Sequence, residues 1–228
     1  MLNSLVAYWK LDEESDGVSG AVTRDDQTPN NHDLTDYNTT GHTTGKVSNC
    51  PSFVLADTNR LVADHHADFV IGDHAWEMAG WVYLAGVGYQ QVITKASDVR
   101  GLEWLLEFYN TTTKFRWAVR NTAGSAWVIA TASVTGSIST WYFVDVYHDP
   151  STDKIGISIN NGAFATADLS GGGYASDTAK VCLSSNDNAT PNTPFGGRID
   201  ELGIWRRLLT AAERTRLYNG GNGLSYPF

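Results

Sequence analysis

Apolar and polar side chains alternate along most of this chain with the two-residue period of a β-strand. The clearest example is the segment 102–109, where every second residue is large and apolar: Leu102, Trp104, Leu106 and Phe108. The same period predicts strands at 5–11, 53–55, 75–84, 91–94, 114–120, 126–132, 141–147, 154–159, 180–184 and 198–206. Polar turns such as Asn160-Asn161-Gly162 separate these segments. About ten short strands joined by such turns are typical of an all-β sandwich or barrel.

The pattern changes near the C-terminus, where it predicts one short helix. Thr210 and Glu213 have the spacing of a capping box, in which each side chain accepts a hydrogen bond from an otherwise unpaired backbone N–H. Gly220-Gly221 follows and ends the helix, because glycine readily adopts the left-handed conformation. No linker, repeat or low-complexity tract divides the chain. We therefore expect residues 1–228 to form a single domain.

Composition and charge narrow the classes of partner. The formal net charge of −9 argues against nucleic acid, whose phosphates need clustered Lys and Arg, and favours a hard cation instead. No apolar run is long enough to cross a bilayer, so we expect no membrane insertion. Cys50 and Cys182 are too few for a disulfide framework and form no C-x-x-C pair. We expect two buried free thiols, with one disulfide as the alternative.

Five segments, in order along the chain, resemble the laminin-G-like jelly-roll domains of the concanavalin A-like lectin/glucanase superfamily. They are "LVAYWKLDE" at 5–13, "GKVSNCPSFVLADTNRLVA" at 45–63, "WEMAGWVYL" at 76–84, "WYFVDVYHDPSTDKIGISINNG" at 141–162 and "FGGRIDELGIWRRLLTAAERTRLYNGG" at 195–221. The resemblance implies an antiparallel jelly-roll sandwich of two sheets with one short C-terminal helix. In many such relatives the concave sheet holds carbohydrate.

Alternation also predicts which side chains point away from the core. Nine of them would share one solvent-facing surface if their strands belong to one sheet: Trp81, Tyr83, Glu103, Glu107, Tyr109, Arg116, Arg120, Asp145 and Tyr147. Aromatic rings stack on the C–H faces of sugars, while carboxylates and guanidinium groups bind hydroxyls. We expect these nine to be the ligand-binding residues on the concave sheet. The alternative is that Glu103/Arg116 and Glu107/Arg120 are cross-strand ion pairs.

Two carboxylates on one strand raise the question of glycoside hydrolysis. Laminarinase-like relatives have Glu-x-Asp-x-x-Glu or a close variant, whereas this chain has Leu105 where the middle Asp would be, between Glu103 and Glu107. The strand rise separates these two carboxylates by about 13 Å, more than the span of a paired acid and base. Asp145 on another strand remains a candidate partner. We expect no catalytic residues.

The resemblance also implies one calcium ion, which in many relatives clamps an early loop to the closing strand. The matching positions are Asp25, Asn30 and Asp200. The family's Gly-Asn-Gly-Asn loop is replaced here by Thr28-Pro29-Asn30-Asn31. The alternative is that Asp200 only accepts hydrogen bonds from backbone N–H groups.

A histidine-rich stretch comes in the first third of the chain. Asp64-His65-His66-Ala67-Asp68 is followed by Asp73-His74, and these residue types are metal ligands. Their spacing matches no zinc motif. We therefore expect a polar loop between two strands.

These observations predict a recognition domain that binds a glycan or a cell-surface receptor. Laminin-G-like domains are common on secreted bacterial proteins and on bacteriophage virions, and Met1 leads directly into the first strand without an export signal. We therefore expect the surface of a phage virion, with a bacterial cell surface as the alternative. One rival is a structural virion protein, a capsid decoration or tail component that contacts other virion proteins or forms a homo-oligomer. Another is a glycoside hydrolase or lyase.

Overall fold

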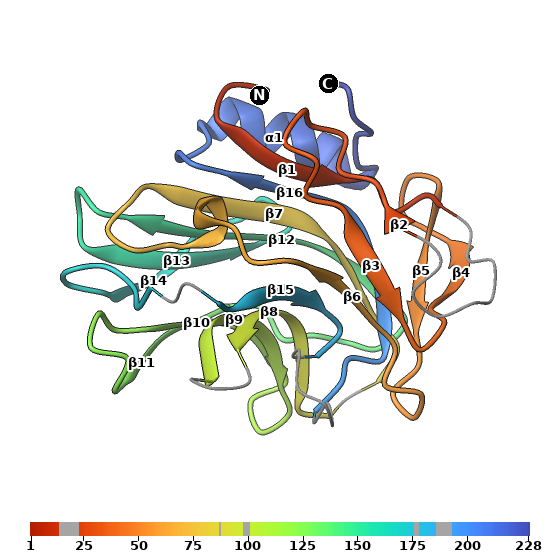
Figure 1. The fold of residues 1–228 in the computed structure, drawn as a ribbon, viewed down its shortest axis with the longest axis horizontal. Helices are drawn as coiled ribbons and strands as arrows, with labels where there is room; N and C mark the ends of the chain where they lie inside the picture. Colours follow the sequence, from red (N-terminus) through yellow and green to blue (C-terminus); the bar gives the residue numbers. More distant parts are fainter. Residues whose placement is uncertain (14–22, 87, 98–100, 176–177, 186–192) are drawn as a thin grey trace.

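The computed structural model describes residues 1–13, 23–86, 88–97, 101–175, 178–185 and 193–228. In these residues two antiparallel sheets of eight strands each face one another, and one short α-helix follows the last strand (Figure 1). The predicted all-β sandwich with a C-terminal helix is therefore confirmed.

The first sheet, sheet A, contains the long central strands of the chain. Its order is β14 (Ala165–Asp168), β13 (Lys154–Ile159), β12 (Thr140–Asp149), β7 (Trp76–Leu84), β16 (Gly197–Trp205), β5 (Asn49–Phe53) and β4 (Gly41–Thr44), and β1 (Leu5–Trp9) also pairs with β16. The closing strand β16 thus lies beside both the first strand and the central one. This order brings the two ends of the chain together on one side of the sandwich (Figure 1).

The second sheet, sheet B, is built from the remaining strands. Its order is β11 (Trp127–Thr131), β10 (Lys114–Arg120), β9 (Gly101–Tyr109), β8 (Gln90–Ser97), β15 (Lys180–Leu183), β6 (Arg60–Ala63), β3 (Leu34–Tyr37) and β2 (Thr23–Arg24). Strands β8 to β11 are consecutive in the sequence and adjacent in the sheet. Side chains that alternation places on one face of these strands therefore lie next to one another.

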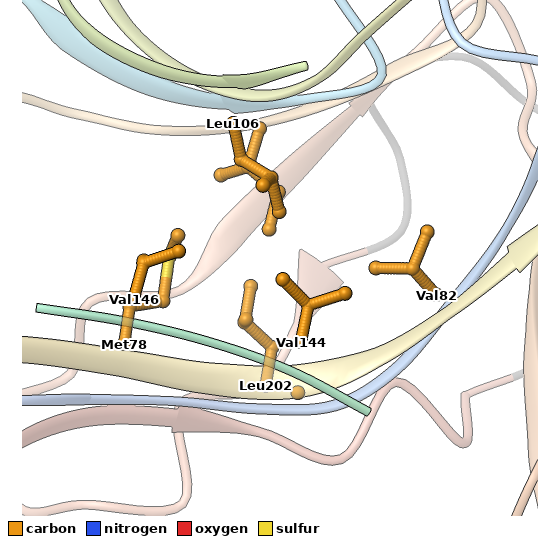
Figure 2. A pocket seen from close by; sticks show the side chains of 8 residues that line it. Met78, Val82, Leu106, Val144, Val146 and Leu202 are labelled. Carbon is orange, nitrogen blue, oxygen red and sulfur yellow. The ribbon is translucent and has the colours of Figure 1, made fainter. Parts of the chain in front are cut away.

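The core lies between the two sheets. Trp76 of sheet A packs against Trp104 and Trp117 of sheet B with ring centroids 5.3 and 5.7 Å apart, and none of the three indoles is exposed. Figure 2 shows Leu106 of sheet B pointing toward Met78 and Val144 of sheet A. The gap between them is a cavity of about 10 Å³ with wholly apolar walls, too small for a ligand.

The long predicted strands are found within one or two residues of their expected ends, but several short ones are not predicted. Strands β2, β3, β4, β6 and β14 have two to four residues each, too few to establish a period. The strand expected at 53–55 is wrong, because β5 ends at Phe53 while Val54 and Leu55 are 47% and 53% exposed. Their apolar character reflects an exposed patch and not a buried strand.

The predicted helix is confirmed as α1 (Ala211–Tyr218). Both halves of the capping box are present, since Thr210 Oγ1 accepts from Glu213 N–H and Glu213 Oε2 accepts from Thr210 N–H, at 3.3 and 2.9 Å. Both cysteines are buried thiols that form no disulfide, Cys50 in sheet A and Cys182 in sheet B. Burial raises the pKa of the Cys50 thiol to about 12, so it is unreactive at neutral pH.

Leu106 tests how tightly this core is packed. Its replacement by alanine enlarges the existing cavity between the sheets, so we expect Leu106→Ala to lower the free energy of unfolding by about 3 kcal/mol in urea denaturation. Ile129→Ala on the outer face of sheet B, where Ile129 is 38% exposed, is the matched control and should change it by less than about 1 kcal/mol. Equal losses for both variants would contradict this assignment of the core.

Candidate functional site

The nine predicted binding residues do not form one surface. Trp81, Tyr83, Asp145 and Tyr147 belong to β7 and β12 of sheet A, whereas Glu103, Glu107, Tyr109, Arg116 and Arg120 belong to β9 and β10 of sheet B. The two groups lie on opposite outer faces of the sandwich. The single nine-residue surface is therefore wrong, because alternation assigns a side chain to a face of its own sheet and says nothing about which sheet that is.

The outer face of sheet A is covered by the end of the chain (Figure 1). The indole of Trp81 is 2% exposed and stacks on Tyr218 of α1, with ring centroids 5.8 Å apart. Tyr226 and Phe228, from the last residues of the chain, pack into the same apolar cluster. Trp81 is thus part of a second core and not a free aromatic platform.

Three charged side chains fix α1 on this face. Asp145 is 1% exposed and lies with the buried Glu77, while Arg214 of α1 places its guanidinium 3.7 Å from a carboxylate oxygen of each. Glu77 also accepts a hydrogen bond of 2.6 Å from Leu209 N–H just before the helix. Burial raises the pKa of both carboxyl groups, to about 10 for Glu77 and about 7 for Asp145. Asp145 therefore anchors the helix and is not available to a ligand.

The other two residues of this group are half-buried by neighbours. Arg198 lies over the ring of Tyr83 at 4.6 Å, and Phe164 packs against Tyr147 with centroids 4.8 Å apart. Gly156, opposite Tyr147, leaves room for its ring, because a Cβ there would lie 2.4 Å from the ring. Both tyrosines flank the covered region of sheet A.

The outer face of sheet B contains a hollow of about 240 Å³. Its walls combine aromatic, aliphatic and charged side chains: Tyr89, Leu102, Leu105, Glu107, Arg116, Ala118, Trp127 and Ile129. They come from β9, β10 and β11 and from the residue before β8. We call this group the sheet B hollow.

The polar part of the hollow is one ion pair. Arg116 Nε donates to Glu107 Oε1 at 2.5 Å across the β9–β10 pairing, and the guanidinium lies 3.6 Å from the ring centroid of Tyr109. Glu107 is 2% exposed, and Tyr89 lies beside it. Burial and this carboxylate raise the pKa of Tyr89 to about 12, so its hydroxyl stays protonated.

The ion pairs differ from the alternative predicted for this sheet. Glu107 pairs with Arg116, which faces it across the strands, and not with Arg120. Glu103 pairs with Lys95 at 2.8 Å, and both side chains are buried. Arg120 instead lies over Trp127 at 4.9 Å and donates to Gly124 O at 2.6 Å. The antiparallel register of β9 and β10, which places Glu107 opposite Arg116, explains why Glu107 does not pair with Arg120.

The sequence interpretation missed Trp127, Ile129 and Tyr89. Trp127 and Ile129 alternate along β11, so the period that selected the other nine residues was present for them too. Tyr89 lies outside a strand, where alternation gives no signal. These three provide much of the aromatic and aliphatic wall of the sheet B hollow.

A second candidate site is a group of three carboxylates. Oxygen atoms of Asp12, Asp200 and Glu201 all lie within 4.8 Å of one another. Asp200 Oδ2 accepts from the backbone N–H groups of Lys46 and Val47 at 2.6 and 3.0 Å, as the alternative for this residue expected. Its other oxygen is buried without a hydrogen-bond partner, as are Asp12 Oδ1 and Glu201 Oε1.

A bulge in the closing strand brings Asp200 and Glu201 together. Side chains of consecutive strand residues normally point to opposite faces, but the pairing of β16 with β7 shifts between Asp200 and Gly203, and Glu201 has φ 49°. Burial raises the pKa of both carboxyl groups to about 7. Two oxygen ligands of one calcium ion lie at most about 5 Å apart, so the three carboxylates fit such an ion.

The predicted calcium residues are only partly in this group. Asp200 belongs to it, and the acidic residue from the early part of the chain is Asp12 instead of Asp25. Asp25 is exposed and accepts from Thr23 Oγ1 at 3.3 Å, while Asn30 Nδ2 donates to Val6 O at 2.7 Å. The "LDE" that directly follows the first strand was the signal for Asp12.

The comparisons with known proteins agree with this architecture. The model of the concanavalin A-like lectin/glucanases superfamily matches residues 57–213, more than half of the chain. The chain belongs to this superfamily. No curated protein sequence matches it.

Solved structures with a similar fold include several binding domains. The binding domain of Paraclostridial Mosquitocidal Protein 1 superposes with a TM-score of 0.73 at 13% identity, over 96% of this chain and 52% of that one. Domain 4 of AbnA, an extracellular GH43 arabinanase from Geobacillus stearothermophilus, in complex with arabinotriose, gives 0.69 at 16% identity, over 93% and 97%. A structure of botulinum neurotoxin type C, whose cell entry depends on interaction with two ganglioside molecules, gives 0.67 at 11%, over 95% and 51%. This chain spans about half the length of the two toxin chains.

In the part of the chain that the structure describes, no helix has the length and apolar character needed to span a bilayer.

The raised carboxyl pKa values predict how stability depends on pH. Glu77, Asp145, Asp200 and Glu201 all hold protons more tightly in the folded state than in the unfolded chain. The stability that this provides is complete below the unfolded pKa near 4 and is lost as pH rises through the folded values. In buffer that contains a chelator, so that no metal ion binds these carboxylates, we expect the free energy of unfolding to fall by about 1 kcal/mol or more between pH 5.5 and pH 8.

Urea denaturation at the two pH values measures this effect, and Asp200→Asn is the informative variant. Because an amide does not titrate, its loss of stability between pH 5.5 and pH 8 should be smaller than that of the wild type. Greater stability of the wild type at pH 8 than at pH 5.5 would contradict the assignment of raised pKa values.

Proposed function

We propose that this chain is a non-catalytic carbohydrate-recognition domain that binds glycans in the sheet B hollow. The observation that supports this most directly is the combination of Trp127 and Tyr89 with the Glu107–Arg116 ion pair in one hollow of about 240 Å³. The hollow replaces the nine-residue surface expected from the sequence. Glu107, Tyr109, Arg116 and Arg120 remain in or beside it.

The side chains of the hollow have the chemistry that a sugar requires. An indole ring presents a flat face to the C–H groups of a pyranose or furanose. The guanidinium of Arg120 lies 4.9 Å from the ring centroid of Trp127 and helps to fix the orientation of this ring. The ion-paired Arg116 and Glu107 offer charged donors and acceptors to hydroxyl groups, and Tyr89 adds a neutral hydroxyl. Pockets that enclose drug-sized ligands measure about 300–1,000 Å³, so this smaller hollow suits the end of a glycan on an open surface.

The same hollow argues against glycoside hydrolysis. That reaction needs two carboxyl groups on either side of the scissile bond, and Glu107 is the only carboxylate among the described residues that line the hollow. One of its two oxygens, Oε1, accepts a hydrogen bond from Arg116 Nε. Glu103 is buried against Lys95, and Asp145 lies on the other sheet. Binding without chemistry is therefore the function that this arrangement supports best.

Calcium bound by Asp12, Asp200 and Glu201 is part of this proposal. Three buried oxygens without hydrogen-bond partners converge there, and the ion would neutralise carboxylates that burial otherwise keeps protonated near neutral pH. The ion would join the segment after β1 to the closing strand β16. Asp200 and Glu201 lie on β16 of sheet A, whereas the hollow is on sheet B. The calcium ion would therefore not contact the glycan, and its role would be structural.

Display of the domain on a phage virion, or on a bacterial cell surface, remains a prediction from the sequence. So does the rival role as a structural virion protein that acts through protein contacts or as a homo-oligomer. Of the structural neighbours described above, one is a binding domain, one is in complex with arabinotriose and one belongs to a toxin whose cell entry depends on two gangliosides. This likeness of fold favours the recognition role.

The sheet B hollow can be tested against the opposite face. We expect Trp127→Ala to weaken glycan binding at least tenfold, about 1.4 kcal/mol, because it removes the stacking surface. Tyr83→Ala on sheet A is the matched control and should bind as the wild type does, since Tyr83 lies on the other outer face. The measurement is a glycan array that includes arabino-oligosaccharides and gangliosides, followed by titration calorimetry with the strongest hit.

Three other results of this glycan-binding experiment would contradict the proposal. Loss of binding in Tyr83→Ala with full binding in Trp127→Ala would move the site to sheet A. Wild-type protein that is folded yet binds no glycan on the array would favour the structural role, and size-exclusion chromatography with light scattering would then test for a homo-oligomer. Release of reducing ends from a bound glycan, lost in Glu107→Gln, would identify an enzyme.

Calcium should stabilise the fold in a pH-dependent way. Because the ion binds the deprotonated carboxylates, we expect millimolar calcium to raise the melting temperature more at pH 8 than at pH 5.5. Asp200→Asn removes one ligand and should abolish most of the shift, whereas Asp25→Asn should retain it. A shift that is lost in Asp25→Asn and kept in Asp200→Asn would return the site to the early loop. Thermal unfolding in calcium and in EDTA measures the effect.

A further inference from the structure

Three metal-ligating side chains meet at a place that neither the hollow nor the carboxylate group uses. Asp68 Oδ2 lies 3.0 Å from His66 Nδ1 and 3.6 Å from His32 Nε2. The two imidazole rings lie side by side, with centroids 4.5 Å apart. His32 comes from the segment before β3, whereas His66 and Asp68 come from the connection between β6 and β7, so only folding brings them together.

His32 is held in place, but its Nε2 makes no hydrogen bond. Its backbone N–H donates to Asp26 Oδ2 at 3.0 Å, its carbonyl accepts from Trp9 Nε1 at 2.8 Å, and Phe69 packs on its ring with centroids 4.8 Å apart. The side chain is only 10% exposed, and its Nε2 is buried without a hydrogen bond. A buried imidazole nitrogen without a hydrogen bond costs free energy unless something binds it.

The distances fit one tetrahedral metal ion. Two donors bound to zinc at about 2.0–2.1 Å lie roughly 3.3 Å apart in tetrahedral geometry. The two separations from Asp68 Oδ2, 3.0 and 3.6 Å, lie on either side of this value. His66 Nδ1 accepts an exposed hydrogen bond of 3.2 Å from Asp68 N–H, which metal binding would break. Water can then accept from this N–H instead.

The surroundings leave an open side for the ion. A hollow of about 170 Å³ adjoins the cluster and is lined by both imidazoles together with Asp33, Asp64, His65 and other polar residues. Asp33 adds a carboxylate to this wall, while Asp64 is paired with Lys180 at 3.0 Å, and the hollow admits water or an external oxygen ligand. Three protein ligands with one open position are typical of metal sites that bind a further molecule.

We propose that His32, His66 and Asp68 form a binding site for a divalent transition-metal ion of the zinc class. Imidazole nitrogens with one carboxylate prefer zinc, copper or nickel over calcium, which selects oxygen ligands. The ion joins the segment before β3 to the loop between β6 and β7, and its fourth position is open to solvent in the adjoining hollow. The site is independent of the glycan hollow and of the carboxylate group on β16.

Zinc binding to the purified chain tests this site directly. Titration with zinc against a chromophoric chelator should give one site per chain, and His66→Ala should weaken it at least tenfold, since this half-exposed side chain can be removed without disturbing the core. His42→Ala, at an exposed histidine of β4 on sheet A, is the matched control and should bind zinc as the wild type does. Asp200→Asn should also leave zinc affinity unchanged, which separates this site from the carboxylate group.

Cobalt provides a second readout that does not depend on affinity. Substitution with cobalt should give the intense visible bands of a tetrahedral ion in the wild type and in His42→Ala, and these bands should be lost in His32→Gln and His66→Ala while circular dichroism shows an intact fold. Absence of zinc binding by the wild type, or equal zinc affinity in His66→Ala and the wild type, would overturn the proposal.

Discussion

The packing of the C-terminal segment on the outer face of sheet A determines which surface of this sandwich remains available. Each sheet has one face in the core and one outside. On sheet A, α1 places Tyr218 on Trp81 and Arg214 beside the buried Glu77 and Asp145. These contacts turn part of that outer face into a second, smaller core. The site proposed for a ligand is therefore on sheet B, where Trp127 and Tyr89 line a hollow.

Four buried carboxyl groups of sheet A connect distant parts of the chain. Glu77 and Asp145 join the two central strands to α1, while Asp200 and Glu201 join β16 to the β4–β5 turn and to the segment after β1. Gly45 in that turn allows the approach, since a Cβ there would lie 2.5 Å from Asp200 Oδ2. Burial raises the pKa of all four groups, so the stability of this sheet is linked to pH and to any cation that replaces the protons.

Proteins with different ligands share the sandwich fold of this superfamily. The binding site must therefore be identified from particular residues and not from the fold. The arabinanase domain and the toxin binding domains share this architecture with 16% identity or less. In this chain the candidate residues are those around the sheet B hollow, and separately the imidazole pair with Asp68. Both sets lie on or beside a rigid sheet, where side chains are held more firmly than on free loops.

The alternation of apolar and polar residues, together with the capping-box spacing, was enough to predict the strand-rich architecture, the short helix and the inward face of each long strand, because these depend on local period and local hydrogen bonds. It also indicated that Glu107 and Arg116 point outward. The three-dimensional arrangement was needed to show that Trp81 and Asp145 are covered, that Asp12 and not Asp25 joins Asp200, and that His32 meets His66 and Asp68. Such contacts join residues far apart in the chain. They depend on strand order, on a bulge at Glu201 and on where the chain end packs, none of which a two-residue period specifies.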